Sequence, residues 1–249
     1  MSGHSKWNNI KHKKEKTDAQ KAKVFTKVGK EIAVAVRAGG ADPAANGKLR
    51  DLIAKAKSLN VPNDNIERII KKASGADAAE YEEIVYEGYG PSGVAVIVET
   101  TTDNRNRTAS DLRHYFDKYG GNLGQTGCVG FLFTEKGVII VTQDEDDRKA
   151  PPIDEDKLME DALEAGAEDV AADDGIFEIT TEPDDLTAVR EALEAKGYHI
   201  ESADRDKIPS NYVTLTDEED IKKMNLLLEH LDDSDDVTEV YHNWENADE

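Results

Sequence analysis

Apolar residues recur at helical spacing through the first third of the chain. Between residues 18 and 75, three such stretches follow one another, separated at Gly39-Gly40 and at Val61-Pro62 and closed by Gly75. Glycine and proline are common helix-ending residues, so each stretch has a defined end. The pattern predicts three short amphipathic helices joined by brief turns, as in a small helical bundle. The predicted inward positions are Val24, Phe25, Val28, Ile32, Leu49, Leu52, Ile53, Ala56, Leu59, Ile66, Ile69 and Ile70.

After Gly75 the pattern changes to short apolar runs that are typical of strands. Residues 84–86 and 94–98 predict two strands around the turn at 90–93, and residues 131–133 predict another. Between them, residues 108–119 have helical spacing. This mixture indicates an α+β region that follows the bundle.

The next elements have an informative order. Residues 137–203 predict β-α-β-β-α-β, which is the order of a ferredoxin-like unit. A further strand at 212–215, a helix at 217–231 and a strand at 237–241 exceed what that unit needs. We therefore expect these late elements to complete the preceding α+β region, with the ferredoxin-like unit inserted into it.

Composition narrows the class of protein. Of the 249 residues, 34% are charged and 38% are hydrophobic, and no apolar run approaches the length of a spanning helix. The single cysteine, Cys128, excludes an internal disulfide, and the first residues lack the apolar segment of a secretory signal. The composition predicts a cytoplasmic protein that does not enter a membrane.

Charge is divided unevenly along the chain. Residues 1–75 contain 17 Lys+Arg against 7 Asp+Glu, a net charge of +10, so residues 76–249 carry −32 of the total of −22. Such asymmetry is typical of a basic module that contacts nucleic acid, although two solvated surfaces would also account for it.

The basic module begins with a polar arm, residues 2–17, in which Trp7 and Ile10 are the only bulky apolar side chains. Lysines neutralise phosphates, and an aromatic ring stacks on an unpaired base. A second cationic row follows the first predicted helix at i, i+4 and i+7. The candidate nucleic-acid contacts are His4, Lys6, Trp7, Lys11, His12, Lys13, Lys14 and Lys16 in the arm, and Lys23, Lys27 and Lys30 in the helix.

A second candidate contact is the segment 103–108, which joins a predicted strand to a predicted helix. Free amides at a helix start suit an anion, and Arg105 and Arg107 would clamp a phosphate. Asn104 belongs to the same candidate set. The alternative is helix capping by Asp103, Asn104 or Thr108, and the spacing alone leaves both interpretations open.

Other motifs indicate no catalytic or metal chemistry. The glycines between 120 and 130 match no nucleotide-binding pattern and favour turns, and Cys128 among apolar neighbours favours a buried thiol. The arm's two histidines have no nearby cysteine, so they do not make a zinc site. The acidic runs at 144–147 and 232–236 lack calcium-loop spacing and favour solvated surfaces. We expect no enzymatic activity, no cofactor and no metal.

Several segments together resemble the YebC/PmpR family. The resemblance is carried by Ser2–Trp7, Ile10–Lys14, Phe25–Lys27, Asp42-Pro43, Asn46, Leu49-Arg50, Pro62–Ile66, Tyr86–Pro91 and Thr102–Thr108. It covers essentially the whole chain, and it departs at Asn8 and in the acidic segment 142–156.

The resemblance implies a multi-domain α+β fold with an N-terminal three-helix bundle, a middle α+β domain and a ferredoxin-like βαββαβ domain inserted into the middle one. We place these domains at 1–77, at 78–134 with 209–245, and at 135–208. It also implies a cytoplasmic, non-enzymatic regulator of gene expression. Family members are described as DNA-binding transcriptional regulators or as translation factors that relieve stalled ribosomes.

Electrostatics favour RNA over promoter DNA as the partner. Duplex DNA presents phosphates along its whole length, so it would repel a tethered body of charge −32. A ribosomal site offers unpaired bases to Trp7 while acidic surfaces face elsewhere. The prediction is a factor acting on ribosomal or transfer RNA at the ribosome, with a DNA-binding transcriptional regulator as the alternative. An enzyme or metal-binding protein that uses the acidic body is the rival class, and the oligomeric state stays open.

Overall fold

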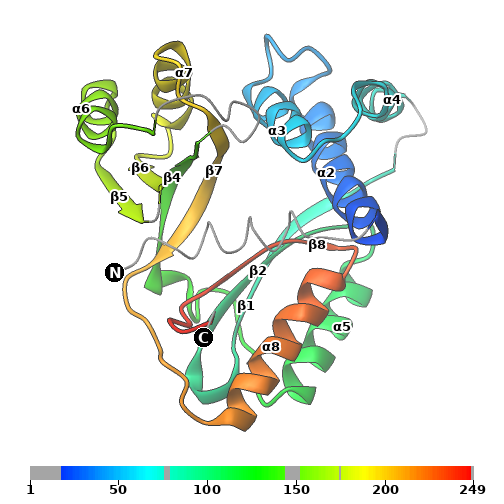
Figure 1. Cartoon of the computed structure of the whole chain (residues 1–249). Coiled ribbons are helices and arrows are strands. Elements are labelled where there is room, and N and C mark those ends of the chain that lie inside the picture. The colour runs from blue at the N-terminus through cyan, green and yellow to red at the C-terminus, as the bar shows by residue number, and fades with distance from the viewer. Residues whose placement is uncertain (1–17, 76–78, 144–151, 174, 248–249) are drawn as a thin grey trace. The chain divides into compact units, whose positions relative to one another are not determined.

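The computed structural model describes residues 18–75, 79–143, 152–173 and 175–247. The described chain divides into two compact units, residues 134–208 and residues 18–133 with 209–247. In sequence, the first unit lies between the two segments of the second. The three domain boundaries stay a prediction, whereas the mixed α+β fold class is confirmed (Figure 1).

Three helices form the predicted bundle: α2 (Asp18–Gly39), α3 (Gly47–Ser58) and α4 (Asn63–Ala73). Their apolar faces meet in one cluster centred on Ile32, Leu49, Ala56 and Ile66. Asn46 caps α3 by accepting a hydrogen bond from the Leu49 amide, and its Nδ2 donates to the carbonyls of Ala35 and Gly40. One side chain therefore fixes the α2–α3 turn.

The same unit contains a four-stranded antiparallel sheet of order β3-β1-β2-β8. Helices α5 and α8 pack side by side on one face, and their apolar residues join Val96 and Val98 of the central strand β2 in one core (Figure 1). The elements are β1 (Glu82–Tyr89), the 3-10 turn η1 (Pro91–Gly93), β2 (Ala95–Thr102), α5 (Arg105–Lys118), β3 (Asn122–Leu123), α8 (Glu218–Asp233) and β8 (Val237–His242).

The other unit has the predicted order β4 (Phe133–Val141), α6 (Glu155–Ala165), β5 (Asp169–Asp173), β6 (Ile176–Thr181), α7 (Leu186–Ala195) and β7 (Ile200–Pro209). Its sheet has the order β5-β6-β4-β7, and both helices contribute to a core against it. Gly166 ends α6 in the left-handed conformation, with φ of 106°.

Two predicted strands are wrong. Residues 131–133 are not a separate strand: Gly130–Leu132 forms the 3-10 turn η2, and Phe133 begins the long strand β4. Residues 212–215 contribute only an isolated bridge between Val213 and Trp244. Both segments are apolar but short, so tertiary contacts decide their conformation.

Candidate nucleic-acid interface

The cationic row of α2 lies against the connection between α8 and β8. We call residues 232–236 the acidic turn. Lys23 Nζ lies 2.9 Å from Asp233 Oδ1, and Lys27 donates to the carbonyl of Asp232. The C-terminus of α8 carries partial negative charge as well, which favours cations at this position. The predicted phosphate contacts of α2 are therefore already bound to internal anions.

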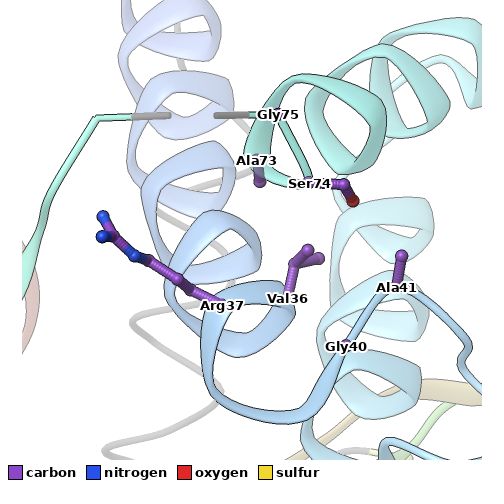
Figure 2. A pocket seen from close by; sticks show the side chains of 7 residues that line it. All are labelled: Val36, Arg37, Gly40, Ala41, Ala73, Ser74 and Gly75. Carbon is purple, nitrogen blue, oxygen red and sulfur yellow. The ribbon is translucent and has the colours of Figure 1, made fainter. Parts of the chain in front are cut away.

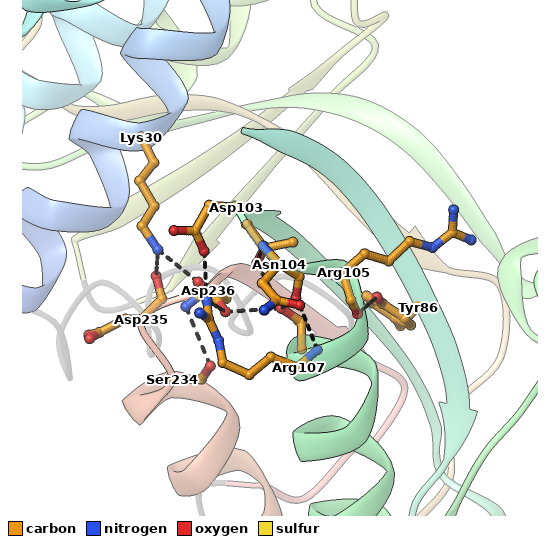
Figure 3. Close-up of polar contacts among 11 residues, drawn as sticks. Lys30, Tyr86, Asp103, Asn104, Arg105, Arg107, Ser234, Asp235 and Asp236 are labelled. Atoms are coloured by element: carbon orange, nitrogen blue, oxygen red, sulfur yellow. Dashed lines mark hydrogen bonds and ion pairs between the residues drawn. The ribbon is translucent and has the colours of Figure 1, made fainter. Parts of the chain in front are cut away.

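Lys30 continues this row to the C-terminal end of the acidic turn (Figure 3). Its Nζ donates to the Asp235 carbonyl and to Asp236 Oδ1, each at 2.8 Å. The side chain of Asp236 is only 8% exposed. The prediction that residues 232–236 form a solvated surface is thus wrong for Asp236, because the run places one carboxylate beneath α2.

Asp236 joins three elements. Its Oδ2 accepts from Arg107 Nη2 at 2.7 Å and from Thr108 Oγ1 at 2.9 Å, both on α5 (Figure 3). Desolvation, the largest influence, raises its pKa, but hydrogen bonds from Arg107, Lys30 and Thr108 together outweigh it and hold the pKa at about 2. The carboxylate is therefore the ionised centre of this cluster.

The segment 103–108 caps a helix. Asn104 is the N-cap of α5, and its Oδ1 accepts from the Arg107 amide at 3.1 Å. The Arg107 guanidinium also binds Asp103 Oδ1 at 2.9 Å. Asn104 and Arg107 are thus used internally, which matches the capping alternative that the spacing left open.

Arg105 differs from Arg107 although the two share a turn. Its side chain extends away from the cluster (Figure 3), and it forms no ion pair with the part of the chain that the structure describes. Its backbone carbonyl accepts from the Tyr86 hydroxyl at 3.4 Å. Of the candidate residues in this loop, Arg105 alone has a charged side chain that is not paired with a described carboxylate.

The remaining candidates, His4, Lys6, Trp7, Lys11, His12, Lys13, Lys14 and Lys16, lie outside the described residues. Their contact with nucleic acid stays a prediction.

Further ion pairs join the bundle to the sheet. Lys55 Nζ lies 3.0 Å from Glu239 Oε1 on β8 and 3.6 Å from Glu31 Oε2 on α2. Burial raises the pKa of Glu31, although Lys55 opposes the shift. Lys48 pairs with Glu83 at 2.7 Å. The apolar clusters of the bundle and of the sheet are separate, so charged residues supply much of this contact.

A hollow of about 420 Å³ lies where the C-terminal ends of α2 and α4 meet (Figure 2). Small residues such as Gly40, Ala41 and Ser74 line it. Arg37, the one charged residue of its described lining, points away from it (Figure 2). The Arg37 guanidinium pairs with Glu80 at 2.7 Å. The described residues that line the hollow include neither an unpaired charge nor an aromatic ring, so we assign no site to it.

The backbone amides of the glycine-rich stretch, residues 120–130, bind the side-chain carboxylate of Glu87. Glu87 accepts hydrogen bonds from the amides of Gly127, Val129 and Gly130 at 2.7–2.8 Å. Burial raises the pKa of Glu87, but the three amides outweigh it and lower the pKa overall. Burial also raises the pKa of the Cys128 thiol. These contacts agree with the predicted turn. Cys128 is half-buried, whereas the sequence predicted a buried thiol.

The described residues include neither a candidate membrane-spanning helix nor a candidate metal-binding group. No helix among them is long and apolar enough to cross a membrane. Within the same ranges, no group of three or more His, Cys, Asp or Glu side chains is arranged to hold a metal ion.

Comparison with known proteins gives a consistent result. The chain matches the TACO1/YebC N-terminal domain over residues 5–76 and the TACO1/YebC second and third domains over residues 81–244. A probable transcriptional regulatory protein from Acetivibrio thermocellus is 58% identical over 245 residues, covering 98% of this chain and 99% of the relative. One of the same description from Finegoldia magna is 56% identical over 247 residues, covering 99% of this chain and all of the relative.

A solved structure has the same fold. The crystal structure of a conserved hypothetical protein from Aquifex aeolicus superposes with a TM-score of 0.80 at 46% identity and covers 92% of each chain. The matched domains span nearly the whole sequence, and the relatives match over their full length. The chain therefore belongs to the TACO1/YebC family.

Proposed function

We propose that the protein is a cytoplasmic, non-enzymatic regulator of gene expression whose partner is RNA at the ribosome. It binds nucleic acid through its N-terminal bundle and arm, with Arg105 of α5 as a further contact. The observation that carries this proposal is that some cations of the bundle are paired with carboxylates of the protein and others are not. Those facing the sheet are bound to carboxylates, whereas Arg50, Lys57, Lys71 and Lys72 are exposed and form no ion pair within the described ranges.

The distribution of charge favours RNA over duplex DNA. Exposed cations attract any polyphosphate, and that attraction falls with salt. The acidic remainder of the chain, at −32, opposes close approach to a continuous duplex, because repulsion acts within about 8 Å at physiological salt. A folded RNA site offers phosphates to the bundle in one place and unpaired bases beside them.

The alternative is a transcriptional regulator that binds promoter DNA. The relatives' description as probable transcriptional regulatory proteins favours it. The two alternatives differ in the nucleic acid that the basic module contacts, and binding experiments separate them.

The first experiment deletes residues 2–16 and follows co-sedimentation with ribosomes together with the salt dependence of RNA binding. The deletion removes Lys6, Lys11, Lys13, Lys14 and Lys16. Each lost phosphate contact lowers the log–log salt slope by about 0.7 for single strands, so the slope falls by up to about 3.5 and ribosome association is lost.

The control is the thermal midpoint of the truncated protein, which we expect to stay unchanged. An unaltered salt slope would contradict the role of the arm. Tight, sequence-selective binding to duplex DNA at physiological salt, without ribosome association, would establish the transcriptional alternative instead.

A further inference from the structure

A groove runs between α2, α4 and the segment that enters β1. Its volume is about 310 Å³. Gly29 lets the two helices approach, since a Cβ there would lie 3.2 Å from Ile69 Cδ1. Among the residues that line it, Phe25 and Ile69 are apolar and half-buried, and Tyr81 is aromatic. We call the first two its apolar floor and Tyr81 its aromatic edge.

Two cations without a described ion-pair partner line the groove beside this apolar floor. Arg68 and Lys72 both line the groove, and their i, i+4 spacing places them on one face of α4. Both side chains are exposed. Arg68 Nη2 donates to Asn65 Oδ1 at 2.9 Å, and neither cation forms an ion pair with any described carboxylate. The acidic residues of α4, Asp64 and Glu67, do not line the groove.

Lys30 also reaches the groove, but its charge is already offset. Its Nζ lies 5.8 Å from the centre of the Tyr81 ring while it binds Asp236. This contact places a cation on Tyr81 and connects the groove to the acidic turn. The groove thus combines an apolar floor, an aromatic edge and two cations whose charge is not offset.

We propose that this groove binds an unpaired nucleotide of single-stranded RNA. A base would lie on the apolar floor beside Tyr81, and Arg68 and Lys72 would bind the flanking phosphates. The volume is at the lower end of the range for ligand sites, about 300–1,000 Å³, which suits one nucleotide. Bases stacked inside a duplex cannot enter it. This inference rests on the proposed function and specifies where the bundle binds.

The main test measures the fluorescence anisotropy of a labelled 12-nucleotide oligouridylate with the full-length protein. Because two phosphate contacts are lost, Arg68→Ala with Lys72→Ala should lower the log–log salt slope by about 1.4 and weaken binding about tenfold. The matched control, Arg113→Ala with Lys222→Ala, removes the same charge from exposed positions of α5 and α8 that lie outside the bundle and do not line the groove. It should weaken binding less than threefold.

Equal losses in the two double variants, or no loss in the first, would overturn the groove proposal. Annealing the oligouridylate to its complement should abolish the difference between the variants. A difference that persists with the duplex would also count against an unpaired base.

A second variant tests the aromatic edge at constant charge. Tyr81→Ala should weaken oligouridylate binding about fivefold, the equivalent of about 1 kcal/mol for one lost stacking contact, while Tyr81→Phe should bind like the wild type. Ultraviolet crosslinking of 4-thiouridine-substituted oligonucleotide should label a peptide containing Phe25 or Tyr81. Crosslinks confined to other peptides would overturn the placement.

The outcomes separate the two proposals. If the wild type binds ribosomes and oligouridylate but the groove variants are unaffected, only the groove proposal fails. If the wild type binds neither, the proposed function itself fails.

Discussion

Helices α2 and α4 belong to the same bundle and carry cations at the same helical spacing, yet those cations have different surroundings. Lys23, Lys27 and Lys30 of α2 are bound to the acidic turn, whereas Arg68 and Lys72 of α4 have no carboxylate partner in the described chain. A phosphate must displace a carboxylate to reach the first set but not the second. The availability of a cation therefore depends on the element packed opposite it. We infer that α2 attaches the bundle to the acidic turn, whereas α4 keeps its cations accessible to a partner.

The largest expected effect concerns the carboxylate on which the α2 contacts converge. Asp236→Ala leaves Lys30, Arg107 and Thr108 without their shared acceptor. Removing one member of a buried ion pair costs about 3 kcal/mol. We expect a loss of about this size in the free energy of unfolding, measured by urea denaturation.

The matched control for this variant is Asp235→Ala, at the exposed neighbour whose carbonyl, rather than its side chain, accepts from Lys30. It should change stability by less than about 0.5 kcal/mol. Equal effects of the two variants would show that the acidic turn acts only through its net charge.

The next largest effect is a decrease in the free energy of unfolding as the pH falls below about 5. The folded pKa of Asp236, about 2, lies below its ordinary value of 3.8, so the unfolded chain binds a proton more readily than the folded protein. Its contribution is complete above about pH 5 and is lost as the pH falls toward 2, a change of about 2 kcal/mol. Asp236→Asn should flatten this part of the stability profile between pH 5 and pH 2. An unchanged acid slope would mean that other carboxylates, such as Glu87, account for it.

Much of the fold could be predicted because its signals are local. The stripe through Val28 and Ile32 fixes the buried face of α2, and alternation around the turn at 90–93 fixes the β1–β2 hairpin. The wrong strands, at 131–133 and 212–215, are short apolar runs without a periodic pattern. For such runs, long-range contacts outweigh local preference.

The candidate site was less predictable because ion pairing joins positions far apart in sequence. Lys30 and Asp236 are separated by 206 residues, and nothing local in residues 232–236 distinguishes a buried aspartate from its exposed neighbours. The groove could not be predicted for the same reason, because residues far apart in sequence line it. The outward spacing of Arg68 and Lys72 is visible in the sequence, but their position beside Phe25 and Tyr81 requires the packing of α4 on α2.

The smallest expected effect separates two arginines on one turn of α5. Arg107 binds Asp103 and the buried Asp236, but its own side chain is 48% exposed, so solvent screens part of the attraction. Arg107→Ala should cost about 1 kcal/mol of stability. Arg105→Ala should leave the thermal midpoint unchanged, because its guanidinium extends away from the cluster (Figure 3). RNA binding should show the reverse order, with Arg105→Ala the more damaging. If the two variants lost RNA binding in proportion to their loss of stability, the loop would have only a structural role, like the lysines of α2. The arm and α4 would then be the remaining contacts with nucleic acid.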